Sequence, residues 1–230
     1  GRHEVFDALL GRYVSGGGVD YAAWHANEAD RQALRDYLES LERAPISQLE
    51  EEPGGRDVAL AYWINLYNAA TLNLVLDGYP TTSIKKLGGL FSSPWKRDVV
   101  EVEGEKLTLN DIEHGIIRPR FEEPRIHFAL NCAARSCPPL RAGAYVGEDL
   151  DAQLEEQTRS FLGDPEQNWI DEEGKLHLSK ILDWYGEDFE KAAGSVQAWV
   201  GPYLVKTGEP APDDDASVKH LDYDWSLNES

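Results

Sequence analysis

Hydrophobic residues recur at helical spacing in the first part of the chain. Leucine, valine and tyrosine side chains fall on one helical face over positions 5–10 and again over positions 34–41. Between the two runs, residues 14–21 contain three consecutive glycines, which favour a loop. The pattern therefore predicts that residues 1–45 form helices joined by a glycine-rich turn.

The most apolar stretch of the chain runs from residue 57 to residue 76. Hydrophobic side chains cover most of the helical circumference there, which predicts a central buried helix that ends at Gly78 and Pro80. Asn65 and Asn68 lie on one side of this helix. Because buried amides have to be hydrogen-bonded, these two residues either tie the helix to neighbouring backbone or face a cleft and position a substrate or a histidine.

Alternation of polar and apolar residues predicts the strands. A β-hairpin is expected over residues 95–109, a strand over 125–131, a second hairpin over 168–178 and a last strand over 218–225. In the strand at 125–131, Ile126, Phe128 and Leu130 would share one face and His127, Ala129 and Asn131 the other.

Helical spacing returns in the second half of the chain. Thr108 and Asp111 form a capping box that opens a short helix, and further helices are predicted over residues 149–162, 181–192 and 196–203. The expected fold is α+β, with helices packed on a small, mostly antiparallel sheet. We expect a single domain over residues 1–230, made of a helical N-terminal part (1–50) and a second part over residues 57–230.

Composition narrows the classes of function. The 230 residues are 41% hydrophobic, which supports a folded core, and the 42 acidic against 22 basic residues give a net charge of −20 at pH 7. Such a charge repels a phosphate backbone, so no nucleic-acid partner is expected. No stretch is long and apolar enough to span a bilayer. The chain contains no methionine, so we expect an N-terminus that was processed, with any export signal removed.

The densest group of reactive side chains lies between positions 113 and 137. A thiol attacks as its thiolate, which needs a cationic neighbour, a helix N-terminus or a base. Cys132 follows the predicted strand directly and is the candidate nucleophile. Arg135 would supply positive charge and anchor a substrate carboxylate. The amides of Ala133 and Ala134 would stabilise an oxyanion if the loop turns tightly there.

Two histidines are candidates for the base. On a strand, His127 and Cys132 would point to opposite faces and lie roughly 16 Å apart, so they meet only if the chain bends between them. His114 belongs to a separate helix and is favoured for this reason. Glu113 points about 100° away from His114 on an α-helix and is therefore expected to orient His127 instead.

The two cysteines also allow other interpretations. Cys132 and Cys137 would form a local disulfide in an oxidising compartment, or a redox pair with an unusually long spacing. Together with His114 and His127 they supply the ligand types of a zinc site, but their spacing matches no familiar zinc pattern, and we expect neither a metal nor another cofactor. The aromatic residues at 184–185 and 223–225 are interpreted as packing of helix and strand ends.

Four segments carry a resemblance to a known family. The chain resembles the domain-of-unknown-function family 547, bacterial members of which often carry export signals; this implies a periplasmic or secreted product. The resemblance also suggests a distant relation to papain-like or transglutaminase-like cysteine enzymes, although no cysteine lies on the apolar helix where those enzymes keep theirs. The segments are Tyr62-Trp-Ile-Asn-Leu-Tyr-Asn68, Leu109-Asn-Asp-Ile-Glu-His-Gly-Ile116, Arg125-Ile-His-Phe-Ala-Leu-Asn-Cys-Ala-Ala-Arg-Ser-Cys-Pro-Pro-Leu140 and Tyr223-Asp-Trp-Ser-Leu-Asn228.

The sequence leads to two hypotheses about function. The first is a thiol-dependent hydrolase or acyl transferase that acts on peptide-like or thiol-containing small substrates, with Cys132 as nucleophile and His114 or His127 as base. The second is a binding module of the cell envelope, without catalysis, held by a Cys132–Cys137 disulfide. Rapid alkylation of one thiol favours the first, and resistance of both until reduction favours the second. The oligomeric state is left open.

Overall fold

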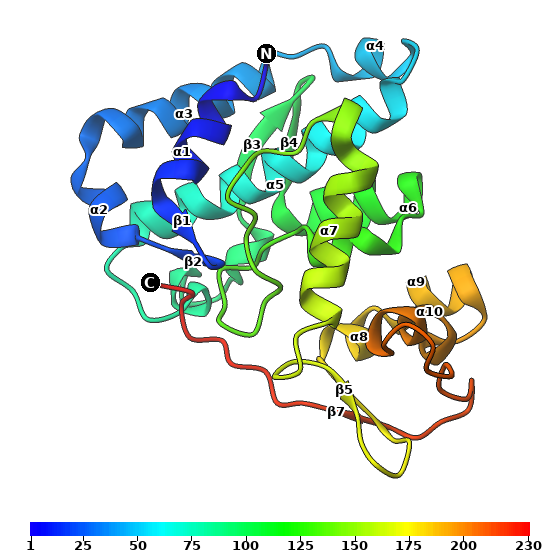
Figure 1. The fold of residues 1–230 in the computed structure, drawn as a ribbon. Helices are drawn as coiled ribbons and strands as arrows, with labels where there is room; N and C mark the ends of the chain where they lie inside the picture. The colour runs from blue at the N-terminus through cyan, green and yellow to red at the C-terminus, as the bar shows by residue number, and fades with distance from the viewer.

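The long apolar segment predicted as a buried helix forms α5 (Gly55–Gly78), which runs through the middle of the molecule (Figure 1). The computed structural model describes residues 1–230. Eighteen residues of α5 are buried, because its neighbours cover it on nearly all sides. The N-terminal helices that pack around it are α1 (Glu4–Tyr13), α2 (Tyr21–Ala26), α3 (Glu28–Glu42) and α4 (Ile46–Glu50).

The strands form three small sheets. The hairpin predicted over residues 95–109 is present as β3 (Asp98–Val102) and β4 (Glu105–Thr108), and Glu103 and Gly104 both have positive φ at its tight turn. The fold class is α+β, as predicted. The other sheets are the pair β1 (Val14–Ser15) and β2 (Gly18–Val19) and the three strands β5 (Trp169–Ile170), β6 (Leu176–Leu178) and β7 (Val218–His220), of which only β6 and β7 are parallel.

The prediction of a strand over residues 125–131 is wrong. Residues Pro124–Phe128 form a 3₁₀ helix, η4, and the chain then turns, with the Leu130 N–H donating to the Ile126 carbonyl. The prediction assumed that one face of the segment is buried and the other solvated. Residues 126–131 are in fact all buried, so their alternation does not indicate a strand. Pro124 begins the turn and the Glu123 side chain accepts from the Arg125 N–H, which favours a helical start.

The apolar residues gather in two clusters. The larger one surrounds α5 and includes the N-terminal helices, β3 and β4. The smaller one joins Phe128 to the helices and strands that follow residue 160. The remaining elements are η1 (Ile84–Leu87), η2 (Pro94–Lys96), η3 (Asp111–Ile117), α6 (Arg118–Phe121), η5 (Gly147–Asp149), α7 (Leu150–Leu162), α8 (Ile181–Trp184), α9 (Gly186–Ala193) and α10 (Val196–Leu204). None of the helices is both long and apolar enough to cross a membrane.

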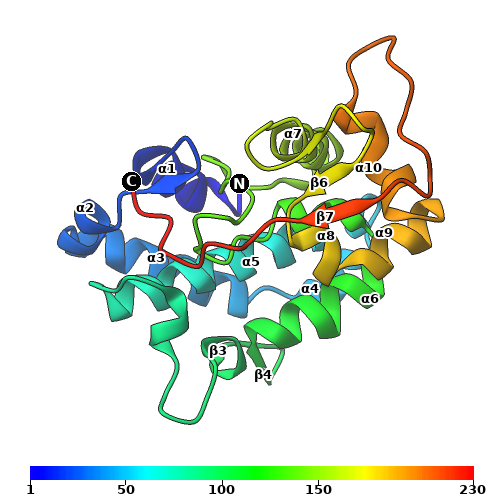
Figure 2. The same cartoon turned by 90° about the horizontal axis from the view of Figure 1, so that it is seen from below.

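The C-terminal tail connects the two clusters. After β7 it runs back along one side of the molecule to the β1–β2 hairpin (Figures 1 and 2). Along this path the N–H of Leu227 donates to the carbonyl of Thr82, and the N–H of Asn228 donates to that of Ala133. The first bond ties the tail to the segment between α5 and η1, and the second holds it against the loop that follows η4, which contains both cysteines.

Candidate functional site

A cavity of about 260 Å³ lies between the two apolar clusters. Cys132, Glu113, His114 and His127, which the sequence proposed as catalytic residues, all line it. The structure therefore brings these four side chains to one place, although they come from η3, η4 and the loop that follows η4. No hydrogen bond joins the Cys132 sulfur to either imidazole; its partners are Tyr223 and Cys137.

The two sulfur atoms are neighbours but are not bonded. The Sγ atoms of Cys132 and Cys137 lie 2.9 Å apart, whereas a disulfide is about 2.05 Å long. The backbone N–H of Cys132 also donates to the Cys137 sulfur over 3.0 Å. Cys137 is buried and Cys132 is partly exposed. One thiol is thus open to the cavity and the second lies directly behind it.

The two thiols differ in acidity. The pKa of Cys132 is lowered below the ordinary value, chiefly by the hydrogen bond to Cys137 and against the effect of burial, with Tyr223 and the Ala134 N–H adding to the shift. Burial raises the pKa of Cys137, and the adjacent Cys132 raises it further. Cys132 therefore ionises first, and Cys137 then donates its S–H to the thiolate.

Tyr223 is a permanent donor to this thiolate. Its hydroxyl lies 3.3 Å from the Cys132 sulfur, and burial, followed by the two cysteines, raises its pKa far above the ordinary value. Ala133, next to the nucleophile, has a φ of 61°, and its N–H donates to the Asn131 side chain. Of the two amides predicted to form an oxyanion hole, that of Ala133 is thus already bonded, and that of Ala134 stabilises the sulfur.

Glu113, His114 and His127 of the cavity wall belong to a continuous chain of polar contacts that extends outside the cavity. His114 Nε2 lies 3.0 Å from a Glu113 oxygen, and His114 Nδ1 lies 3.0 Å from the Arg118 guanidinium. Arg118 makes two hydrogen bonds to Asp188, of 2.8 and 3.0 Å. Asp188 lies 2.7 Å from His127 Nε2. We call Glu113, His114, Arg118, Asp188 and His127 the polar chain.

The polar chain corrects two expectations about orientation. Glu113 contacts its own neighbour His114 and not His127, because residues 111–117 form a π-helical turn that changes the angles between successive side chains. The partner of His127 is Asp188 on α9. Nothing in the local sequence links Asp188 to His127, which lies 61 positions earlier.

The hydrogen bonds distinguish the two imidazoles. Arg118 can only donate, so His114 Nδ1 accepts and His114 Nε2 carries the proton that it donates to Glu113. Both nitrogens of His114 are therefore occupied. Asp188 accepts from His127 Nε2, which leaves a lone pair on His127 Nδ1, a buried atom without a partner. Burial lowers the pKa of His127, so the ring is neutral at pH 7.

Aromatic rings form most of the remaining wall. The Tyr185 ring stacks on His127 with centroids 4.0 Å apart, and its hydroxyl donates to Glu113. Tyr223 and Trp225 of the tail pack against each other at 4.8 Å, and Trp225 contacts Trp95 at 5.5 Å. Sequence reasoning assigned the residues at 184–185 and 223–225 to packing alone. The unusual density of aromatic residues at these positions was the one indication of the wall.

Residues 54–162 match the model of the family described as Protein of unknown function, DUF547. This segment, just under half of the chain, belongs to the DUF547 family. No curated protein and no solved structure matches it. The matched segment carries Glu113, His114, His127 and both cysteines. Tyr223, which lines the cavity, and Asp188, which contacts His127 from outside it, lie beyond the matched segment.

Three residues proposed for substrate binding do not line the cavity of Cys132. Asn65 exchanges two hydrogen bonds with the backbone of Tyr145, and Asn68 bonds the Ala129 carbonyl and the Asn131 N–H. Both amides are buried, and the nitrogen and the oxygen of each have a backbone partner, so they tie α5 to its neighbours. Arg135 lines a different hollow, beside the glycines of the β1–β2 hairpin, and does not line the cavity of Cys132.

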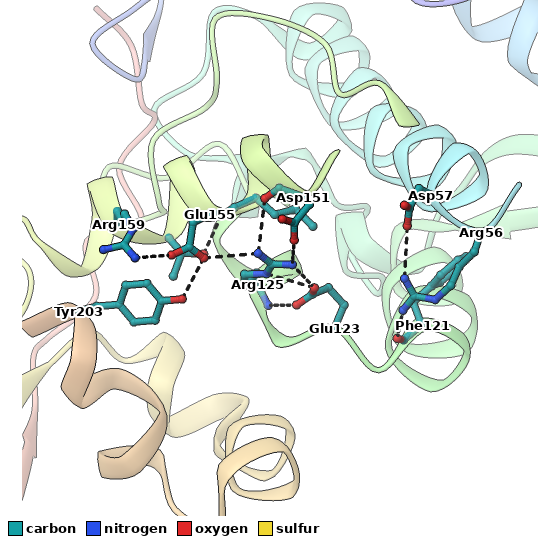
Figure 3. A network of polar contacts seen from close by, with 11 residues as sticks. Arg56, Asp57, Phe121, Glu123, Arg125, Asp151, Glu155, Arg159 and Tyr203 are labelled. Atoms are coloured by element: carbon teal, nitrogen blue, oxygen red, sulfur yellow. Dashed lines mark hydrogen bonds and ion pairs between the residues drawn. The ribbon is translucent and has the colours of Figure 1, made fainter. Parts of the chain in front are cut away.

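Ion pairs anchor the element that carries His127. Arg125 of η4 bonds Glu123, Asp151 and Glu155, and so fixes η4 to α7 (Figure 3). The hydrogen bonds to Glu123, followed by those to Asp151, raise the pKa of Arg125 above its ordinary value, against the effect of burial. His127 follows two positions later in the same turn. No group of three or more His, Cys, Asp or Glu side chains, around the cavity or elsewhere, is arranged to hold a metal ion.

Proposed function

We propose that this protein is a thiol-dependent hydrolase or acyl transferase with Cys132 as its nucleophile. One observation carries the proposal: a partly exposed sulfur with a lowered pKa faces a cavity and is surrounded by donors from Tyr223, Cys137 and Ala134. Such an arrangement stabilises a thiolate without a base in direct contact. The absence of a hydrogen bond between the sulfur and an imidazole is therefore compatible with catalysis.

The reaction would proceed in two steps. The Cys132 thiolate attacks the carbonyl carbon of an acyl donor, a carbon–sulfur bond forms, the bond to the leaving group breaks, and the leaving group takes a proton from solvent. A water molecule or a second nucleophile then attacks the thioester. The carbon–sulfur bond breaks and Cys132 returns as the thiolate.

His127 is the favoured base for the second step. Its Nδ1 has a free lone pair, its ring is neutral, and Asp188 fixes its orientation through Nε2. His114, which the sequence favoured, has no free nitrogen in this arrangement. We propose that His127 Nδ1 accepts the proton of the attacking water or acceptor, and that Asp188 stabilises the imidazolium.

The wall of the cavity suggests the kind of acyl group. Trp95, Tyr185, Tyr223 and Trp225 offer flat apolar surface, and the cavity is large enough for an aromatic or short branched group but not for a folded chain. A peptide-like donor with such a side chain, or a small thioester, fits these dimensions. A relation to papain-like enzymes and a periplasmic or secreted location remain part of the proposal.

The test uses iodoacetamide and an aromatic thioester as probes. We expect one thiol to be alkylated rapidly at neutral pH, and mass spectrometry to find both the label and a transient acyl group on Cys132. Cys132→Ser should abolish both modifications, while Cys137→Ser should keep a reactive but less acidic Cys132. Equal, slow labelling of the two cysteines would refute the proposal.

A second candidate function rests on the distance between the sulfurs. Because the Sγ atoms of Cys132 and Cys137 lie 2.9 Å apart, a small shift lets a low-molecular-mass disulfide oxidise them to a bridge, with the release of two reduced thiols. A permanent bridge would make the protein a binding module of the cell envelope. This alternative predicts that protein from an oxidising compartment resists alkylation until it is reduced.

A further inference from the structure

Leu90 and Phe91 are exposed to an unusual extent. The exposed fraction of Leu90 is 97% and that of Phe91 is 102%, so neither side chain packs against the rest of the chain. They belong to the segment between η1 and β3, and this segment projects from the body of the molecule (Figure 2). Two large apolar side chains fully in water, side by side, indicate a surface that is covered by something else.

The charges around this apolar pair are all positive. Lys85 and Lys86 precede it, Lys96 and Arg97 follow it, and residues 78–97 contain no aspartate or glutamate in a chain with a net charge of −20. All four cations are exposed, and none forms an ion pair. Most arginines outside this segment are paired with a carboxylate. We call residues 84–97 the basic loop.

We propose that the basic loop docks on an anionic membrane surface, with Leu90 and Phe91 inserted at the boundary between headgroups and acyl chains. An apolar pair flanked by lysine and arginine is the chemistry that binds such a surface reversibly. Leu90 and Phe91 line neither of the two hollows described above, and insertion into a bilayer requires no pocket. The cations lie on both sides of this pair. Lys86 donates to the Thr82 hydroxyl and Arg97 to the Leu87 carbonyl, but no cation is neutralised by a carboxylate, so each keeps its charge for lipid phosphates.

The net negative charge of the protein does not prevent this docking. At physiological salt the Debye length is about 8 Å, so a bilayer in contact with the basic loop responds mainly to the charges of the loop itself. The repulsion from the remaining surface would instead orient the molecule with the loop toward the lipid. Binding should therefore be reversible and should weaken as salt is added.

Docking would also place the cavity near the lipid headgroups. Trp95 at the base of the basic loop lines the cavity, and the Lys85 ammonium lies 4.2 Å from the centre of the Trp225 ring, which lines it as well. The loop and the cavity wall are thus one continuous surface. The membrane proposal itself does not depend on the reaction at Cys132.

The experiment is sedimentation of the full chain with vesicles, either of phosphatidylcholine alone or of equal parts phosphatidylcholine and phosphatidylserine. We expect binding to the mixed vesicles only. Lys86→Gln with Lys96→Gln should weaken it roughly 30-fold, because each cation near an anionic surface contributes about a factor of five. Leu90→Ser with Phe91→Ser should weaken it roughly tenfold or more.

Matched variants control for general effects of charge and of exposed apolar groups. Lys206→Gln with Lys219→Gln removes two other exposed cations, and Val5→Ser removes another exposed apolar side chain; neither should alter binding. Cys132→Ser should bind vesicles as the unmodified chain does, which separates this test from that of the proposed function.

Three outcomes would overturn the membrane proposal. These are an absence of binding to mixed vesicles, equal binding to neutral vesicles, and binding that the loop variants leave unchanged. If poly-glutamate binds through Lys86 and Lys96 while vesicles do not bind, the loop is a docking surface for an acidic protein. If sedimentation velocity shows a dimer that Phe91→Ser dissociates, the apolar pair is covered by a second copy of the chain.

Discussion

Two groups of buried polar side chains, one on α5 and one around the cavity, differ in how completely they are paired. In Asn65 and Asn68 both the amide nitrogen and the amide oxygen are hydrogen-bonded to backbone groups of other segments. Around the cavity, His127 Nδ1 has no partner, and the Cys132 sulfur has only the Cys137 thiol and the Tyr223 hydroxyl as side-chain partners. Complete pairing maintains the fold, whereas incomplete pairing next to a cavity leaves groups that can react.

The largest effect is expected from Asn65→Ala, which removes a fully paired group. The Tyr145 N–H and C=O would both lose their partner in the protein interior, at a cost of about 3 kcal/mol in the free energy of unfolding. Denaturant unfolding measures the loss. Alkylation of Cys132 should keep its pH dependence, because Asn65 does not line the cavity.

Asn73→Ala is the matched control on the same helix. The Asn73 amide makes one long contact, of 3.5 Å, to Asp77, and its oxygen has no partner. We expect a change in stability within about 0.5 kcal/mol. If both asparagine variants lose the same stability, the contrast between paired and unpaired amides is wrong.

A smaller effect is expected from Asp188→Asn, which interrupts the polar chain. The pKa of Asp188 is held well below 3.8: burial raises it, but hydrogen bonds from His127 and Arg118 lower it by more. The ionised carboxylate is therefore favoured in the folded state. Its contribution is present above pH 3.8 and is lost as the pH falls through the folded value.

The variant should lose about 2 kcal/mol of stability at neutral pH, and the difference from the unmodified protein should narrow below pH 3.8. Unfolding in urea across this pH range measures it. Asp183→Asn, an exposed carboxylate nearby without a hydrogen bond from its side chain, serves as control and should behave as the unmodified protein. A difference that persists unchanged into acid would contradict the assigned ionisation.

The smallest effect is expected from Tyr223→Phe, which removes one donor to the thiolate. The midpoint of Cys132 alkylation should lie below pH 9.0 in the unmodified protein and should rise by about one unit in the variant. Tyr185→Phe is the matched control, because its hydroxyl lies in the same cavity but bonds Glu113. A midpoint that moves equally in both variants would argue against a specific contact with Tyr223.

Hydrophobic periodicity was sufficient to predict the central helix and the first long hairpin. The apolar run at 57–76 became α5, the alternation at 95–109 became the β3–β4 hairpin, and Thr108 and Asp111 exchange the hydrogen bonds of the predicted capping box. It failed at 125–131, where every side chain from 126 onward is buried and the period carries no information. The group of reactive residues between positions 113 and 137 was also visible in the sequence.

The sequence by itself determined the α+β class, the central helix and the group of reactive side chains between Glu113 and Cys137. These features depend on the order of residues within short segments of the chain. Only the tertiary structure decided which nitrogen of His127 is free, since that depends on Asp188, 61 positions away. It also decided that the tail brings Tyr223 to the Cys132 sulfur, 91 positions away. Contacts between distant segments leave no period in the sequence, so they arise only when the chain has folded.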